Sequence, residues 1–183
     1  MKRHTMTWLA VVVLGMPGGV ARAGSDNARN VLATHRLTVL DGTVTTLAAC
    51  RGELVVVNFW ASWCAPCRNE LPRLDQWNTA WKNRGARVIA ISIDQDETRA
   101  RRFVEETKLA LTVVHDGPDG LARSLDIPSV PYTLLLDRDG NVIASVRGSA
   151  EADVAALGRR VEGMLAAGGV KPVQEAGVSG GTR

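Results

Sequence analysis

Two cysteines lie three positions apart where an apolar run passes into a helical pattern. The apolar run covers residues 54–60, the helical pattern begins near Arg68, and Cys64 and Cys67 stand between them. A cysteine at a helix N-terminus lies beside unpaired N–H groups and the positive end of the helix dipole, which stabilise a thiolate. The spacing therefore predicts a redox-active pair. A zinc site would need two more ligands at metal spacing, and the sequence has no second cysteine pair and no histidine cluster.

The first residues have the pattern of an export signal. Lys2 and Arg3 precede a mostly apolar run from residue 6 to 16, and Ala21-Arg22-Ala23 fits the small-x-small cleavage pattern. The run is shorter than the roughly 20 residues of a membrane span. We therefore predict a cleaved signal over residues 1–23, with an uncleaved N-terminal anchor as the alternative, and a periplasmic or otherwise extracytoplasmic location.

The net charge of the chain comes from this predicted signal. The sequence has 22 basic and 19 acidic residues, and removing Lys2, Arg3 and Arg22 with the signal leaves 19 of each. A formally neutral mature chain gives no reason to expect binding to nucleic acid or to a membrane surface.

The remaining sequence alternates strand and helix patterns. Buried strands are expected at 54–60 and 87–93, with a helix from Arg68 to Arg84 between them, so these elements form a parallel βαβ unit. A helix capped by Asp96, a strand at 111–115 and a short helix at 121–125 follow. Strands at 132–137 and 142–147 should pair antiparallel, because only a short turn joins them. The pattern predicts an α/β fold with a mixed sheet.

The two ends of this domain carry weaker signals. Residues 24–34 are polar and are expected to form a mobile lead-in, followed by a β-hairpin around Asp41-Gly42. A last amphipathic helix is expected after Ser149, with Ser149 as its cap. Residues 168–183 are Gly-rich without periodicity and are predicted to be a disordered tail. The predicted domain thus covers residues 24–167.

Several motifs together resemble the thioredoxin superfamily. Residues 59–67, Phe-Trp-Ala-Ser-Trp-Cys-Ala-Pro-Cys, are similar to its active-site signature, which includes Ala65 and Pro66. Val130-Pro131-Tyr132-Thr133 resembles its cis-proline loop, and Pro72 lies where the family has a kinking proline. The export signal, the hairpin and an extra β-α segment before Pro131 make the chain most similar to the TlpA/ResA-like reductases. The resemblance implies a three-layer thioredoxin-like sandwich.

The resemblance also implies an activity and partners. Proteins of this kind are exported thiol:disulfide oxidoreductases that reduce protein disulfides, with apocytochrome c or copper-site cysteines as possible clients. A membrane thiol relay of the DsbD or CcdA kind supplies the electrons. No cofactor beyond the Cys64–Cys67 disulfide and no metal is implied, and a monomer is expected. Cys64 is the expected nucleophile and Cys67 the resolving cysteine.

Glu70 is predicted to take part in proton exchange with Cys67. Positions 67, 70, 74, 77 and 81 form one helical stripe that is otherwise Cys, Leu and Trp, so Glu70 should face the core beside the buried sulfur. Burial would raise its pKa. TlpA/ResA-like proteins have a Glu at the matching place, while Asn58 stands where thioredoxin has a buried Asp. The alternative is a solvated acid in the first helical turn.

Three further residues are expected at the site. Pro131 is the candidate cis-proline, although most X–Pro bonds are trans. Val130 would then offer its backbone groups to a substrate strand, and Trp63 would be an exposed apolar contact beside Cys64. Cys50 is left over. It is either a small buried side chain or a thiol that bonds to another molecule or has a regulatory role.

Two other functions fit the cysteine pair. A disulfide-forming oxidase would use the same residues in the opposite direction. A copper-binding chaperone would use Cys64 and Cys67 as ligands, but it would need a nearby His or Met that the sequence does not place.

Overall fold

The apolar run at 54–60 forms the central strand of a seven-stranded sheet in the computed structural model, which describes residues 22–168. The strand order is β2-β1-β5-β4-β3-β6-β7. The strands are β1 (Leu37–Val39), β2 (Val44–Thr45), β3 (Leu54–Trp60), β4 (Ala86–Ser92), β5 (Thr112–His115), β6 (Tyr132–Leu136) and β7 (Val142–Arg147). Every residue of β3 is buried, as expected for a strand covered on both faces.

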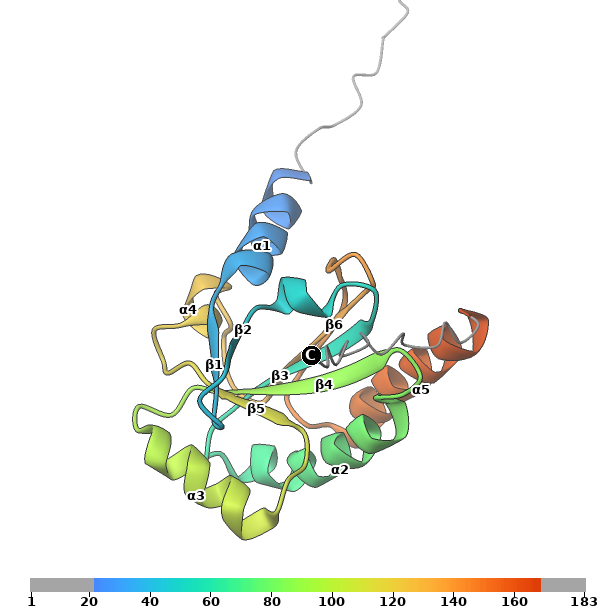
Figure 1. Ribbon diagram of the computed structural model, residues 1–183. Coiled ribbons are helices and arrows are strands. Elements are labelled where there is room, and N and C mark those ends of the chain that lie inside the picture. Colours follow the sequence, from blue (N-terminus) through green and yellow to red (C-terminus); the bar gives the residue numbers. More distant parts are fainter. Residues whose placement is uncertain (1–21, 169–183) are drawn as a thin grey trace, which may run out of the picture.

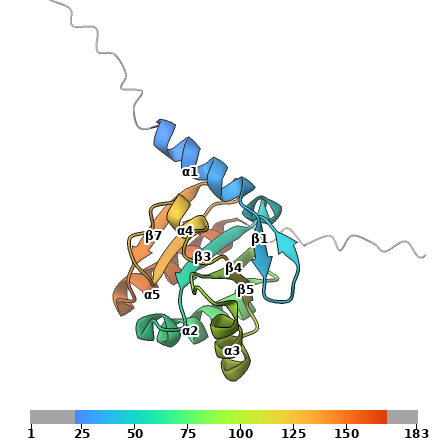
Figure 2. The same cartoon turned by 90° about the vertical axis from the view of Figure 1, so that its left-hand side faces the viewer.

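Helices cover both faces of this sheet (Figures 1 and 2). One apolar cluster joins the sheet to α2, α3 and α5, and a second joins its other face to α1, α4 and the short 3-10 helix η1. Their bounds are α1 (Arg22–Thr34), η1 (Leu47–Cys50), α2 (Ala65–Trp81), α3 (Glu97–Thr107), α4 (Leu121–Ser124) and α5 (Glu151–Ala167). The three-layer α/β sandwich with a mixed sheet is therefore confirmed.

The predicted strand pairings are also confirmed. Strand β3 pairs parallel with β4 across helix α2, as predicted, and the structure adds a parallel pairing of β4 with β5. Strands β6 and β7 pair antiparallel, and β1 and β2 form the expected N-terminal hairpin. Between Cys67 and Pro131 the chain adds α3, β5 and α4 to the βαβ unit. This topology brings the ends of β3 and β4 to the same edge of the sheet, where the cysteine pair lies.

Two local predictions were wrong. The polar segment expected as a mobile lead-in belongs to helix α1, and Leu32 of that helix is fully buried against the layer of η1 and α4. Ser149 does not cap the last helix: α5 has Ala150 as its N-cap residue, without a side-chain hydrogen bond. By contrast, the Asp96 side chain caps α3 by accepting from the Thr98 N–H, as predicted.

The predicted signal and tail fall at the ends of the chain. Residues 1–21 and 169–183, which hold most of both segments, lie outside the described residues. In the part of the chain that is described, no helix is both long and apolar enough to cross a membrane.

Candidate active site

The cysteine pair lies at the junction of strand β3 and helix α2. Cys64 is the N-cap residue of α2, and its sulfur accepts a hydrogen bond from the Cys67 N–H at 3.3 Å. Pro66 stands in the first turn, where a missing N–H leaves no hydrogen bond unmade. The helix thus begins one turn earlier than the apolar pattern predicts, because the cysteines and the proline form its first turn.

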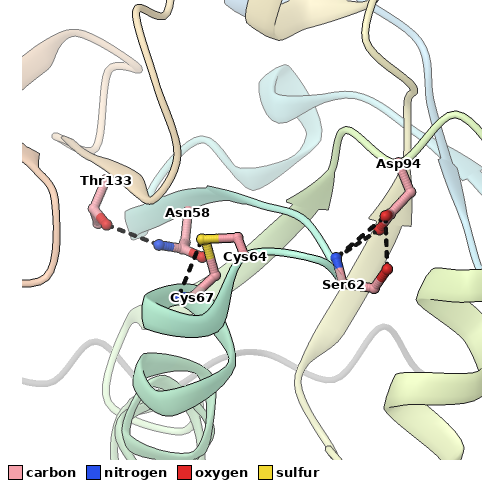
Figure 3. Close-up of a disulfide and its surroundings, with 6 residues drawn as sticks. All are labelled: Asn58, Ser62, Cys64, Cys67, Asp94 and Thr133. Atoms are coloured by element: carbon pink, nitrogen blue, oxygen red, sulfur yellow. Dashed lines mark hydrogen bonds between the residues drawn. A yellow bond between two sulfur atoms is a disulfide. The ribbon is translucent and has the colours of Figure 1, made fainter.

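The two cysteines are joined by a disulfide (Figure 3). Cys67 is fully buried, whereas Cys64 retains 6% of its surface. Cys64 is therefore the sulfur that a partner can approach, and its place at the N-terminus of α2 favours a thiolate after reduction.

Glu70 lies on the buried side of α2, one turn after Cys67. Only 7% of its surface is exposed, and neither carboxylate oxygen has a hydrogen-bond partner among the described residues. Burial raises the pKa of Glu70 from 4.5 to about 7, against the opposing effects of the Arg73 charge and the Thr133 hydroxyl. The helical stripe correctly predicted that this acid faces inward.

An open pocket of about 440 Å³ adjoins Glu70. Its walls include Ala65 and Pro66 from the start of α2 and Ser149 from the loop before α5. At its rim the Arg73 guanidinium donates to the Glu151 carboxylate at 2.5 Å, which joins α2 to α5. Glu70 therefore lines an open pocket beside the cysteine pair, while its two carboxylate oxygens are themselves buried.

Asn58 and Thr133 form a buried hydrogen bond under the cysteines. They are direct partners in the pairing of β3 with β6, and the Asn58 side-chain amide donates to the Thr133 hydroxyl at 2.9 Å (Figure 3). Each is 1% exposed. The side-chain carbonyl oxygen of Asn58 has no hydrogen-bond partner among the described residues. The side chain on β3 beside the cysteine pair is thus an uncharged amide, which cannot exchange a proton there.

The Val130–Pro131 peptide bond is cis. Pro131 is buried and its carbonyl accepts from the Gly148 N–H, whereas Val130 is half-buried. Within residues 22–168, neither the N–H nor the C=O of Val130 makes a hydrogen bond. Trp63 is 62% exposed, as expected for a contact surface. The protein therefore presents the unpaired backbone groups of Val130 and the exposed indole of Trp63.

Asp94 was missed by the sequence analysis. It is 1% exposed and follows β4, and its carboxylate accepts from the Ser62 N–H at 2.9 Å, the Ser62 hydroxyl at 2.8 Å and the Ser92 hydroxyl at 2.8 Å (Figure 3). Ser62 lies two residues before Cys64, so Asp94 fixes the loop that carries the cysteine pair. The sequence did contain an indication of this role. Asp94 directly follows the predicted strand at 87–93, so it lies at the edge of the sheet where the neighbouring parallel strand also ends.

Cys50, the two tryptophans of the α2 stripe and two histidines lie in structural environments. Cys50 is buried, and burial raises the pKa of its thiol. Trp81 is buried, and Trp77 stacks against it with ring centroids 5.0 Å apart. His35 pairs with Asp116, and a ring nitrogen of His115 lies 2.8 Å from the Asp94 carbonyl. Among the described residues, no group of three or more His, Cys, Asp or Glu side chains is arranged to hold a metal.

Comparison with known proteins agrees with this geometry. The AhpC/TSA family matches residues 29–145. The thiol-disulfide oxidoreductase ResA of Bacillus thuringiensis subsp. konkukian is 30% identical over 112 residues, which cover 61% of this chain and 65% of ResA. The chain thus spans about two thirds of the length of the curated relatives it matches.

Two solved structures are similar over most of the domain. A Chlorobium tepidum protein, provisionally assigned as the thiol:disulfide interchange protein DsbE, is 31% identical with a TM-score of 0.67, over 71% of this chain and 92% of the other. A thiol:disulfide interchange protein from Bacteroides sp. is 28% identical with a TM-score of 0.62, over 74% and 88%. With its paired cysteines and its cis-proline loop, the chain belongs to the AhpC/TSA family and is a TlpA/ResA-like thioredoxin-fold protein.

Proposed function

We propose that this protein is an exported thiol:disulfide oxidoreductase that reduces disulfides in client proteins. The observation that carries the proposal is the Cys64–Cys67 disulfide at the N-terminus of α2, with the more exposed of the two cysteines at the N-cap. The ResA and interchange-protein names of its relatives support the same chemistry. Electrons are carried by the cysteine pair itself.

The reaction transfers two electrons in two exchange steps. In the reduced protein the Cys64 thiolate attacks one sulfur of the client disulfide and releases the other client sulfur as a thiolate. The Cys67 sulfur, after losing its proton, then attacks the Cys64 sulfur of the mixed disulfide. The second client sulfur leaves as a thiolate, so the client is reduced and Cys64–Cys67 is oxidised.

Glu70 supplies the proton exchange for the second step. Cys67 is fully buried, so water cannot easily take its proton. The Glu70 carboxylate lies on the same face of α2 and, with a pKa of about 7, exchanges protons near neutral pH. The adjacent pocket lets the carboxyl group return this proton to solvent.

Client recognition is assigned to the surface around Cys64. Trp63 offers an exposed apolar contact, and the unpaired N–H and C=O of Val130 can pair with an extended client segment. Cis-Pro131 offers no N–H of its own and holds Val130 at this edge. Ala65 and Pro66 complete the surface at the start of α2.

The setting of this reaction is also part of the proposal. The N-terminal signal pattern supports a periplasmic protein, in which the pair must be reduced again after each turnover. A membrane thiol relay of the DsbD or CcdA kind is the proposed electron donor, and apocytochrome c or copper-site cysteines are the proposed clients. The protein acts as a monomer in this scheme.

Matched trapping variants test the chemistry. Cys67→Ser keeps the attacking sulfur but cannot resolve the mixed disulfide, so it should accumulate covalent client complexes on a non-reducing gel. Cys64→Ser is the control and should trap none. Equal trapping by both variants, or by neither, would contradict the assigned roles.

The direction of electron flow needs a separate measurement. Cells that carry an intact membrane relay are quenched with acid, and free thiols are alkylated to reveal the redox state of Cys64 and Cys67. A mostly reduced pair supports a reductase. A mostly oxidised pair would overturn that direction and favour a disulfide-forming oxidase.

A further inference from the structure

The Thr133 hydroxyl is buried between β3 and β6, on the face of the sheet that packs against helix α2. It follows cis-Pro131 by two residues, and its partner across β3 and β6 is Asn58. The Asn58 amide donates to the hydroxyl oxygen at 2.9 Å, and both side chains are 1% exposed. The hydroxyl is therefore used as an acceptor on one side.

The proton of this hydroxyl has no assigned acceptor. A threonine hydroxyl can donate one hydrogen bond while it accepts another, but within residues 22–168 Thr133 donates none. The buried side-chain oxygens without a partner are the Asn58 carbonyl oxygen and the two Glu70 carboxylate oxygens. The Asn58 amide already turns its NH₂ group toward Thr133, so its carbonyl oxygen points elsewhere. Among these side-chain oxygens, those of Glu70 are the available acceptors, and the Thr133 hydroxyl is close enough to this carboxyl group to lower its pKa.

We propose that Thr133 is a positioning residue for Glu70: its hydroxyl donates to the Glu70 carboxylate when that group loses its proton, and Asn58 orients the hydroxyl for this. The inference rests on the proposed function, in which Glu70 exchanges a proton with Cys67. Its physical effect is to stabilise the charged carboxylate in a buried site. The direction of the Thr133 effect on the pKa of Glu70, which is downward, agrees with this.

The amide at position 58 gives this hydrogen-bond chain its direction. Because Asn58 donates to Thr133, the hydroxyl proton must point away from β3. A carboxylate at the same position would accept that proton and leave Glu70 without its donor. The chain therefore runs from Asn58 through Thr133 to Glu70, and the neutral residue on β3 supports the single acid on α2.

Other charged groups near Glu70 act independently of Thr133. Arg73 follows on the same helix and lowers the pKa of Glu70, and Glu151 of α5 faces it across the pocket while paired with Arg73. Cys64 and Cys67, at the start of α2, are joined in the disulfide and titrate only after it is reduced. Strands β3 and β6 contribute the uncharged Asn58 and Thr133. Substitution of Thr133 leaves all of these charges in place.

The test is a direct titration of the Glu70 carboxyl carbon by NMR in the oxidised full chain. Thr133→Val removes the hydroxyl but keeps the branched shape, so the pKa of Glu70 should rise by about one unit. Thr133→Ser retains the hydroxyl and should restore the pKa to the parent value. Should the valine variant fold poorly, Thr133→Ala gives the same expectation. An unchanged pKa in the folded valine or alanine variant would overturn the proposal.

A kinetic measurement separates this inference from the proposed function. The pH profile for reduction of a model protein disulfide should move upward by about one unit in Thr133→Val. In a Glu70→Gln background the same substitution should leave the profile unmoved. If the parent protein reduces no disulfide but the carboxyl titration still shifts, the proposed function fails and the hydrogen bond stands. If the protein is active and the titration does not shift, only the role of Thr133 is lost.

Discussion

Two buried carboxylates flank the cysteine pair, and their surroundings differ sharply. Asp94 follows β4 and accepts hydrogen bonds from the Ser62 N–H and from the Ser62 and Ser92 hydroxyls. Glu70 lies on α2 and has no partner for either oxygen among the described residues. The exposed fractions are similar, 1% and 7%, so burial alone does not separate them.

The two carboxylates differ in the hydrogen bonds that replace their lost contacts with water. Burying a carboxylate costs free energy unless hydrogen bonds to it replace those of water. Asp94 has such bonds and joins the loop before Cys64 to the end of β4. Glu70 accepts none among the described residues, and burial raises its pKa to about 7 against the smaller opposing effects of Arg73 and Thr133, so the group can take up and release a proton near neutral pH. One acid therefore holds the site in place, and the other is suited to its chemistry.

Replacing Asp94 should produce the largest loss of stability. Asp94→Asn substitutes an NH₂ group for one acceptor oxygen, which leaves a buried donor of Ser62 or Ser92 without an acceptor. We expect the free energy of unfolding to fall by about 3 kcal/mol in urea titrations followed by tryptophan fluorescence.

Asp96→Asn is the matched control for this substitution. Asp96 is exposed and caps α3, and Asn is an equally good cap, so the change should be below about 0.5 kcal/mol. Equal stability of the two variants would show that Asp94 does not hold the loop.

Glu70→Gln should have the opposite effect, which grows as the pH rises from 4.5 to above 7. The pKa of Glu70 is raised from 4.5 to about 7, so between these values the folded protein keeps a proton that the unfolded chain releases. This contribution to stability is fully present below pH 4.5 and is lost as the pH rises through 7. Between about pH 4 and pH 8.5, the free energy of unfolding of Glu70→Gln should therefore increase by on the order of 2 kcal/mol relative to that of the parent.

The same urea titrations, repeated across this pH range, measure the gain. The difference between the two proteins isolates Glu70, because all other titrating groups are shared. A constant difference across the range would mean that Glu70 is solvated like an ordinary surface acid, and the contrast with Asp94 would disappear.

Local patterns in the sequence predicted most of the fold. The continuous apolar run at 54–60 predicted β3, and the helical stripe after Cys67 predicted α2. The short turn before residue 142 requires β6 and β7 to pair antiparallel. Helix α1 was not predicted, because its polar sequence is stabilised by burial of Leu32 against distant elements. Ser149 was mistaken for a cap because a serine before a helical pattern is a common cap, whereas here it borders the pocket beside Glu70.

The site was predictable where one element carries it. Cys64, Cys67 and Glu70 share helix α2, so their spacing indicated that they lie together. Thr133 and Asp94 reach the site from β6 and from the end of β4. Their contacts depend on the register of β3 with β6 and on the meeting of strand ends, and neither can be read from spacing along one segment.

Ser62→Ala should have the smallest effect and should sharpen the contrast most. It removes the hydroxyl that donates to Asp94 at 2.8 Å but leaves the Ser62 N–H bond intact, so stability should fall by about 1 kcal/mol. Ser62→Thr, which keeps the hydroxyl, is the control and should remain closer to the parent. The pKa of Glu70, followed by carboxyl-carbon NMR, should stay at about 7 in both variants, because none of the groups that shift it is changed. A shift of the Glu70 titration in Ser62→Ala would mean that the two carboxylates are coupled through the active-site loop, and that the structural and the titrating acid cannot be treated as separate parts of the site.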